Sequence, residues 1–207
     1  MSRSDDKKAQ TRRRVLHEAA AAIRAVGPEG IGVSTLMGKA GLTHGGFYAH
    51  FKSKDDLVAQ AIALMFEDSY QLFLDRTANP DPKQALVNYI DMYVSARHRD
   101  DPEHGCPLPS LSGDLARMPG AAREQFAAGL GRLTRAIAGL LEKLGRPAPD
   151  RLADSMVAEM VGAVALSRAV PEEAAARRIL DRSREAIKSR LGLINIKNQG
   201  VMRSPPS

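Results

Sequence analysis

The sequence predicts an all-α fold. Apolar residues recur at the three- and four-residue spacing of amphipathic helices over most of the 207 residues, and we find no convincing run of alternating β-branched residues. Glycine and proline mark the ends of these periodic stretches, as they do between consecutive helices. With 43% hydrophobic and 26% charged residues, the composition is that of an ordinary globular protein. We therefore expect helices joined by loops, in one large domain or two modest ones.

Four helices are predicted in the first third of the chain. They cover residues 6–26, 33–40 and 44–51, followed by a long helix that begins after Ser53. Gly27-Pro28 closes the first helix, and Gly41 supplies a left-handed stop after the second. Thr43 and Ser53 stand where a side-chain oxygen caps the helix that follows. Two short helices joined by a tight turn are therefore expected between two longer ones.

The rest of the chain repeats the helical pattern. Further helices are predicted over residues 83–98, 110–117, 121–144, 150–169 and 172–191. Between the first two of these lies a polar loop over residues 99–109 that includes Cys106. The polar tail, residues 195–207, ends in Pro-Pro-Ser and is predicted to be disordered.

The net charge of +6 lies in the first quarter of the chain. Residues 1–54 hold ten Lys and Arg against four Asp and Glu, whereas the remaining residues hold twenty of each. A basic segment beside a neutral body is typical of a protein that touches polyanions, although a solvated face gives the same composition. The three arginines of residues 12–14 are likewise either phosphate contacts or part of a solvated face. We predict a basic domain over residues 1–54, a helical domain over residues 55–194 and the tail beyond it.

The composition disfavours several classes of protein. A single cysteine leaves no internal disulfide framework, no apolar run approaches the roughly 20 residues of a membrane helix, and the start is too polar for a secretory signal. Nucleophile-elbow, phosphate-loop and zinc-protease motifs are missing. We expect a cytoplasmic, non-enzymatic protein without cofactor, metal or membrane partner. The alternatives are a helical enzyme or carrier, and a membrane-surface protein, which the alanine-rich first helix disfavours.

The informative motif is the stretch of residues 33–57, VSTLMGKAGLTHGGFYAHFKSKDDL. Two short helices joined by a tight turn form a helix-turn-helix, which lays its second helix in the major groove of DNA. Gly45 and Gly46 fall in the first turn of that helix, where each costs roughly 1 kcal/mol relative to alanine. Since no packing gain is evident, we interpret the pair as allowing close approach to a phosphate. The edge beside it is rich in donors: Tyr48, His50, Lys52 and Lys54.

This segment resembles the DNA-binding domain of the TetR/AcrR family of bacterial regulators, whose pattern runs roughly AGVS-x-G-x-x-Y-x-HF-x-x-K-x-x-L. The matching positions are Ala40, Gly41, Leu42, Thr43, Gly45, Tyr48, His50, Phe51, Lys54 and Leu57. The resemblance implies an N-terminal three-helix DNA-binding domain joined to a helical ligand-binding and dimerisation domain. It also implies that Tyr48 and Lys54 bind phosphates and that the start of the recognition helix reads bases. The chain departs from the pattern at Gly32, where Thr or Ser is usual, and at Gly38.

We predict a set of DNA contacts on these two helices and the turn that follows. It comprises Ser34, Thr35, Thr43, His44, Gly45, Gly46, Tyr48, His50, Lys52 and Lys54. His44, at the first position of the recognition helix, is a candidate for base or phosphate contact. Tyr48 has an alternative as a half-buried core aromatic, and His50 as a cap or packing residue. Ser34 and Thr35 are also common at helix starts for local reasons.

The expected function is that of a ligand-relieved repressor. Two recognition helices held by a homodimer would enter successive major grooves of an inverted-repeat operator in double-stranded DNA, about 34–36 Å apart. A small-molecule or thiol-reactive inducer in the C-terminal domain would favour a dimer with another spacing and release the DNA. Activation in place of repression is compatible with the same sequence.

Dimerisation is predicted to run through the last two helices. Their apolar stripes comprise Leu152, Met156, Val157, Met160, Val161 and Val164 in the first, and Ile179, Leu180, Ile187 and Leu191 in the second. This is more apolar surface than one helix pair needs. Pairing with a second copy would give a four-helix bundle with twofold symmetry.

The candidates for ligand binding or sensing are Cys106, Tyr89, Tyr93 and Phe126. Cys106 precedes a proline suited to the first turn of a helix. His104, with Arg97 or Arg99, would lower the pKa of the thiol, whereas neighbouring acidic residues would raise it. The segment also resembles regulators of the same family that carry Gly-Cys before the sixth helix, some of which respond to electrophiles or oxidants. A buried structural thiol is the alternative, and the spacing of His98, His104 and Cys106 matches no standard zinc pattern.

Overall fold

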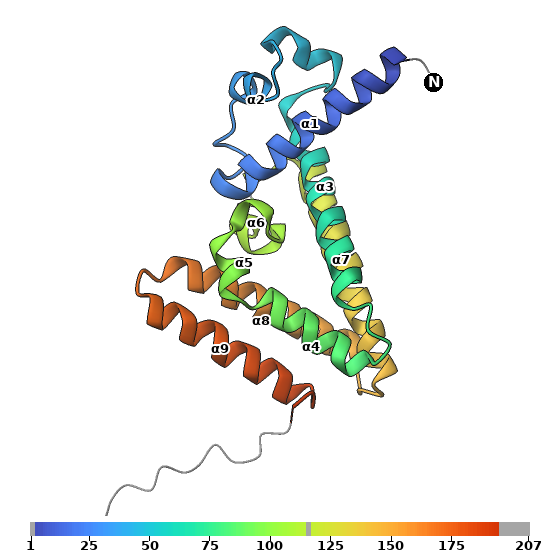
Figure 1. Ribbon diagram of the computed structural model, residues 1–207, viewed down its shortest axis with the longest axis vertical. Coiled ribbons are helices and arrows are strands. Elements are labelled where there is room, and N and C mark those ends of the chain that lie inside the picture. The colour runs from blue at the N-terminus through green and yellow to red at the C-terminus, as the bar shows by residue number, and fades with distance from the viewer. Residues whose placement is uncertain (1–2, 115–116, 195–207) are drawn as a thin grey trace, which may run out of the picture.

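The computed structural model describes residues 3–114 and 117–194, and every regular element within these ranges is helical (Figure 1). The elements are α1 (Arg3–Val26), α2 (Val33–Lys39), η1 (His44–Ala49), α3 (Lys54–Arg76), α4 (Pro82–Tyr93), α5 (Ala96–Asp100), η2 (Pro102–His104), α6 (Pro107–Leu111), α7 (Gly120–Lys143), α8 (Pro149–Ala169) and α9 (Glu173–Arg190). The prediction of an all-α fold is confirmed. The predicted tail lies outside the described residues.

The N-terminal lobe holds α1, α2 and η1, which lie together at one end of the molecule (Figure 1). Ile23 of α1, Met37 of α2 and Phe47 of η1 are among the largest fully buried side chains. Gly41 has a φ of +67°, the left-handed conformation predicted for it, and Gly27 has a φ of +76° after α1. These two turns let α2 and η1 fold back onto α1.

The third short helix differs from its prediction. It is a 3-10 helix, η1, rather than the α-helix expected over residues 44–51. The Gly46 N–H donates to the Thr43 carbonyl (3.1 Å) and the His50 N–H to the Phe47 carbonyl (2.9 Å), both with three-residue spacing. Glycines at its start have little preference for an α-helix, so the tighter and shorter form is reasonable. Thr43 precedes η1 as predicted, but its side chain accepts no capping hydrogen bond.

The helix predicted over residues 83–98 and the loop after it also differ. α4 ends early, and Ser95 opens α5 by accepting a hydrogen bond from the His98 N–H (3.2 Å). The predicted loop folds into η2 and α6, each with a proline in its first turn. The helix predicted over residues 110–117 therefore begins earlier, at Pro107, and ends at Leu111.

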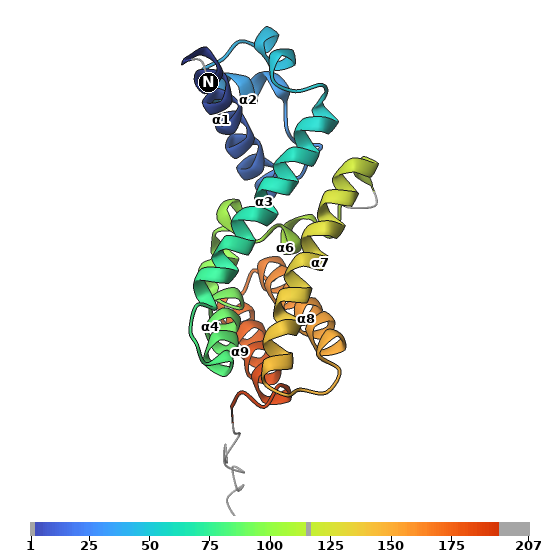
Figure 2. The same cartoon turned by 90° about the vertical axis from the view of Figure 1, so that its right-hand side faces the viewer.

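The α3 helix connects the N-terminal lobe to the body formed by α4–α9 (Figure 2). It packs against α1 in the lobe and against α7 in the body, and α7, α8 and α9 pack in chain order. Gly129 allows the close contact of α7 with α3, because a Cβ at this position would overlap the Phe66 ring. The predicted boundary after residue 54 coincides with the first residue of α3, and it stays a prediction because α3 contacts both parts. None of the described helices is long and apolar enough to cross a bilayer.

Candidate DNA-binding surface and ligand cavity

Tyr48 projects from the surface of η1. Its neighbours Phe47 and Phe51 point into the core, where their ring centroids lie 5.5 Å apart. The Tyr48 ring touches Phe47 edge-on at 5.2 Å and is 71% exposed. The alternative of a half-buried core aromatic is therefore wrong. The phenol is presented to solvent at the place where a phosphate contact was predicted.

A reciprocal pair of hydrogen bonds fixes the start of α3. Ser53 Oγ accepts from the Asp56 N–H (3.1 Å), and the Asp56 carboxylate accepts from the Lys52 N–H (2.9 Å) and from Gln60 Nε2 (2.7 Å). Two hydrogen bonds lower the pKa of the Asp56 carboxyl: the one from the Lys52 N–H has the larger effect, and the one from Gln60 has the smaller. Ser53 thus caps α3 as predicted. The cap holds the backbone that carries exposed Lys52 and half-buried Lys54.

Gly45 and Gly46 have no internal packing reason to be glycine. A Cβ at Gly45 would meet no atom within 4 Å among the described residues. At Gly46 it would make ordinary contacts, 3.7 Å from Met37 Cε and 3.8 Å from the Thr43 side chain. The protein itself would accept alanine at either position. This supports the interpretation that the glycines serve an external partner.

The remaining predicted contacts lie in α2, in η1 and in the turns on either side of η1. Thr43, Ser34 and Thr35 are exposed, the last two in the first turn of α2. His44 begins η1, but its side chain lies outside the described part of the structure. His50 follows η1 and is half-buried, and burial, then Lys8 and Arg12, lower its pKa. His50 is therefore mostly neutral at pH 7 and partly fulfils the packing alternative.

Two arginines of α1 bond to the neighbouring helices α3 and α2. Arg12 bonds to the Gln60 side chain and lies over the Phe51 ring, with 5.4 Å from Cζ to the ring centroid. Arg14 donates to the Ala40 carbonyl at the end of α2. These contacts tie α1 to α3 and α2. The arginine run was predicted to be a solvated face or a phosphate site. No sequence pattern indicated that two of its members bond to other helices.

The body contains a cavity of about 200 Å³ between α3, α4 and the α5–η2 segment. Three of the four predicted ligand residues, Tyr89, Tyr93 and Cys106, line it together. Phe126 does not. It lines a separate hollow of about 230 Å³ between α6, α7 and α8, and its ring packs edge-on against Phe66. The predicted set therefore divides between two places in the fold.

Cys106 is the N-cap residue of α6, as its position before a proline predicted. It is 7% exposed, and its N–H donates to His98 Nε2 (3.0 Å). Burial raises the pKa of the thiol, so the expectation of a lowered pKa is wrong. His104, which was expected to lower it, is exposed and pairs with Asp101 instead (2.8 Å).

The hydrogen bonds of His98 determine its tautomer. Nε2 accepts from the Cys106 N–H, so the ring proton is on Nδ1, which donates to the Tyr93 carbonyl (2.7 Å). Burial, then the charge of Arg168, lowers the pKa of this histidine, while the bond to Tyr93 opposes the change. His98 is thus a neutral clamp between the end of α4 and the start of α6. Within the described ranges, no three His, Cys, Asp or Glu side chains are grouped to hold a metal.

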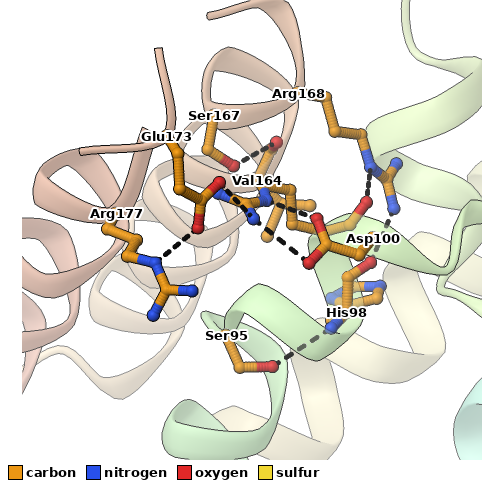
Figure 3. A network of polar contacts seen from close by, with 9 residues as sticks. Ser95, His98, Asp100, Val164, Ser167, Arg168, Glu173 and Arg177 are labelled. Atoms are coloured by element: carbon orange, nitrogen blue, oxygen red, sulfur yellow. Dashed lines mark hydrogen bonds and ion pairs between the residues drawn. The ribbon is translucent and has the colours of Figure 1, made fainter. Parts of the chain in front are cut away.

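The cavity wall of residues 95–106 is bonded to the C-terminal helices (Figure 3). Arg168 of α8 donates to the carbonyls of His98 (2.9 Å) and Arg99 (3.0 Å). Arg99 in turn pairs with Glu173 at the start of α9 (2.9 Å). Guanidinium groups therefore tie this segment to α8 and α9.

The same segment is also bonded to α1. Arg24, buried in the last turn of α1, donates to the Glu103 carbonyl (3.2 Å) and pairs with Asp68 of α3 (3.8 Å). Burial lowers the pKa of Arg24, and Asp68 opposes this change. One short stretch thus connects the cavity with both the N-terminal lobe and the C-terminal helices.

Known proteins share both the motif and the fold. Residues 15–61 match the model for bacterial regulatory proteins of the TetR family. No match among curated protein sequences is significant. The fold is similar to that of a TetR transcriptional regulator from Chloroflexus aurantiacus, with 26% identity, a TM-score of 0.78, and 90% of this chain and 96% of that chain covered. NemR of E. coli in its reduced form has 17% identity and a TM-score of 0.76, with 86% and 96% covered. A TetR-family regulator from Cytophaga hutchinsonii has 20% identity and a TM-score of 0.76, with 93% and 98% covered.

A helix-turn-helix mounted on an all-helical body defines a DNA-binding regulator. The family match over the motif and the similarity over nearly the whole fold indicate which family of such regulators the chain resembles. Residues 15–61 are those of a TetR-family DNA-binding domain, and the fold of the chain as a whole is similar to that of TetR-family transcriptional regulators, as the resemblance implied. Proteins of this family are in general DNA-binding rather than enzymatic.

Proposed function

We propose that the protein is a homodimeric repressor that binds an inverted-repeat operator and is released by a small-molecule inducer. The observation that carries the proposal is that exposed Tyr48 and Lys52 and half-buried Lys54 follow one another closely along the segment of the chain that holds the net positive charge. The capped start of α3 fixes the backbone at the end of this segment. Donors on a fixed backbone suit phosphates, which position the protein while the start of η1, with His44, reads bases.

The dimer is expected on α8 and α9, through a smaller patch than the sequence suggested. Met156 and Met160 of the predicted stripe are buried within the chain, because α8 packs between α7 and α9. Of the apolar side chains on these two helices, Leu166 is 61% exposed, and Leu152, Val161 and Ile179 are half-buried. We infer that the second copy packs on the exposed faces of α8 and α9 and covers Leu166.

The inducer is expected in the cavity lined by Tyr89, Tyr93 and Cys106. Its wall is bonded to α1 through Arg24 and to α8 through Arg168. A ligand that displaces this wall would act on the DNA-reading lobe and on the dimer helices together. Half-sites one turn apart need recognition helices about 34–36 Å apart, so a shift of a few ångströms would end simultaneous engagement.

Release by a thiol-reactive compound is the second candidate, because Cys106 lines the same cavity. The thiolate is the reactive form, and burial of Cys106 disfavours it. The test is to treat the wild type and Cys106→Ser with a mild thiol-reactive electrophile and to follow operator binding. Release of the wild type alone would support the thiol. Equal release of both proteins, or of neither, would eliminate it as the switch.

Selection of bound sequences from a random DNA pool tests the main proposal and yields the operator, which should be an inverted repeat. Gel-shift titrations should show an affinity that falls steeply with salt, because phosphate neutralisation releases counterions. A reporter behind the selected operator separates repression from activation. The absence of salt-dependent DNA binding would favour a helical enzyme or carrier. A stable monomer in light scattering at micromolar concentration would overturn the two-half-site mechanism.

A further inference from the structure

The cavity between α3, α4 and the α5–η2 segment has a charged mouth and an uncharged inner end. The exposed residues at its mouth are Asp68, Leu72, Arg76, Arg97, Asp101 and His104. The formal charges of the two Asp and the two Arg in this set cancel, so the mouth attracts neither anions nor cations in particular. The inner end is formed by buried Tyr89, Tyr93 and Cys106, with Met92 half-buried beside them. A ligand therefore meets aromatic and sulfur-containing side chains once it is inside.

Among the described residues, the inner end contains a fully buried polar atom without a hydrogen-bond partner. The Tyr93 hydroxyl is buried and makes no hydrogen bond within the described part of the chain, although the side chain is only 2% exposed. The Cys106 thiol lies beside it and influences its pKa, but the two do not form a hydrogen bond of ordinary geometry. Unpaired buried hydroxyls are costly and uncommon in native proteins. An acceptor atom of a ligand would satisfy this one.

The acceptor that fits is neutral rather than anionic. Burial raises the pKa of both the Tyr93 phenol and the Cys106 thiol, so both groups keep their protons at neutral pH. Arg24 lies near enough to favour a thiolate, yet burial outweighs its charge. A ligand carboxylate at the inner end would meet the same desolvation penalty. The oxygen of a neutral carbonyl accepts a hydrogen bond without the desolvation penalty of a charged group.

Size and wall chemistry define the rest of the ligand. A cavity of about 150 Å³ can hold benzene, so the volume of about 200 Å³ has room for one substituted ring. The rings of Tyr89 and Tyr93 are tilted by 56° with centroids 5.8 Å apart, and Met92 adds a thioether, which packs well on aromatic edges. We propose that the cavity binds a small neutral aromatic carbonyl compound, whose oxygen accepts a hydrogen bond from the Tyr93 hydroxyl. This inference names the chemical class of the inducer proposed above. Binding of the compound stands on the cavity itself, and only its effect on DNA binding rests on the proposed function.

Three matched probes test the proposal by calorimetric titration of the full chain. Acetophenone carries the carbonyl, α-methylstyrene replaces its oxygen by a methylene group, and benzoate carries a charge. We expect acetophenone to bind about tenfold more tightly than α-methylstyrene, which corresponds to one hydrogen bond to an otherwise unpaired donor. Benzoate should bind more weakly than acetophenone.

Tyr93→Phe should lower the affinity for acetophenone to that for α-methylstyrene, whose own affinity should not change. Tyr70→Phe is the matched control, because Tyr70 lies outside the cavity and stacks on Phe73. Removing an unpaired buried hydroxyl should leave the Tm of Tyr93→Phe equal to or above that of the wild type. Thermal unfolding therefore shows whether a loss of binding comes from a folded protein.

Several results would overturn the assignment of the ligand class. These are equal affinities for acetophenone and α-methylstyrene, tighter binding of benzoate, no saturable binding of any probe, or equal effects of Tyr70→Phe and Tyr93→Phe. A different result separates this inference from the proposed function. If acetophenone binds in a Tyr93-dependent manner but does not release the selected operator, the ligand class stands and the inducer role of the cavity fails.

Discussion

Replacing Lys54 tests the DNA-binding surface quantitatively. Lys54 is the first residue of α3, next to the Ser53 cap, so its position on the backbone is fixed before DNA binds. If each protomer uses Lys54 for one phosphate, Lys54→Ala removes two contacts from a dimer. The slope of log K against log salt should then become less steep by about 1.8. Over a fourfold rise in salt, the advantage of the wild type over the variant should shrink about twelvefold.

The assay is a gel-shift titration on the selected operator at several salt concentrations. Lys83→Ala is the matched control, since Lys83 is an exposed lysine in the first turn of α4 and the change in net charge is the same. Tyr48→Phe should weaken binding without altering the slope, because it removes a hydrogen bond and no charge. If Lys54→Ala retains the affinity and slope of the wild type, Lys54 does not contact phosphate and the predicted docking of α3 is wrong.

Three further predictions concern stability. Gly129→Ala places a methyl group on the Phe66 ring. The free energy of unfolding should fall by about 1–3 kcal/mol, and the Tm by about 2–4 °C for each kcal/mol. Gly139→Ala is the control and should not lower the Tm, because its methyl group meets no described atom within 4 Å. Ser53→Ala removes the acceptor at the start of α3 and should cost about 1 kcal/mol, with Ser53→Thr retaining most of the wild-type Tm; equal Tm values for the two variants would contradict this. The pKa of His98 is lowered in the folded state, so the unfolded chain takes up this proton first as the pH falls, and the free energy of unfolding should decrease below about pH 6.5. Urea titrations at several pH values should show a weaker decrease in His98→Gln, and an unchanged decrease would refute the role of His98.

The DNA-reading motif could be predicted because its signals are local. Gly41 and Ser53 act on residues within one turn, so spacing alone places the stop and the cap. The same spacing puts Phe47 and Phe51 in the core and leaves Tyr48 outside. Two local predictions were wrong. Thr43 does not cap the next helix with its side chain, and η1 forms where an α-helix was expected, because apolar periodicity and the low helix preference of two glycines gave opposite indications.

The cavity could be predicted only in part, because its members come together through a break in the helical pattern. Tyr89 and Tyr93 lie one turn apart on α4, and periodicity places them on one face. Cys106 joins them because the chain leaves α4 and begins again at Ser95, which apolar spacing does not indicate. Phe126 has the same chemical character but lies on α7, where helix packing assigns it to another hollow. Residue type therefore predicted the kind of lining, and only the fold could assign its members.

The arginines that bond to the cavity wall had no signal in the sequence. Arg24 and Arg168 each stand in the last turn of a helix, where a cation is common because of the helix dipole. In the structure they donate to backbone carbonyls of one segment, Arg24 to Glu103 and Arg168 to His98. A backbone acceptor carries no residue type, so a pattern of opposite charges cannot reveal such a contact. Because the two guanidinium groups hold the segment from α1 and from α8, we expect a change in the cavity wall to act on both the N-terminal lobe and the C-terminal helices. This shared attachment is the physical basis for expecting a ligand in the cavity to alter the affinity for DNA.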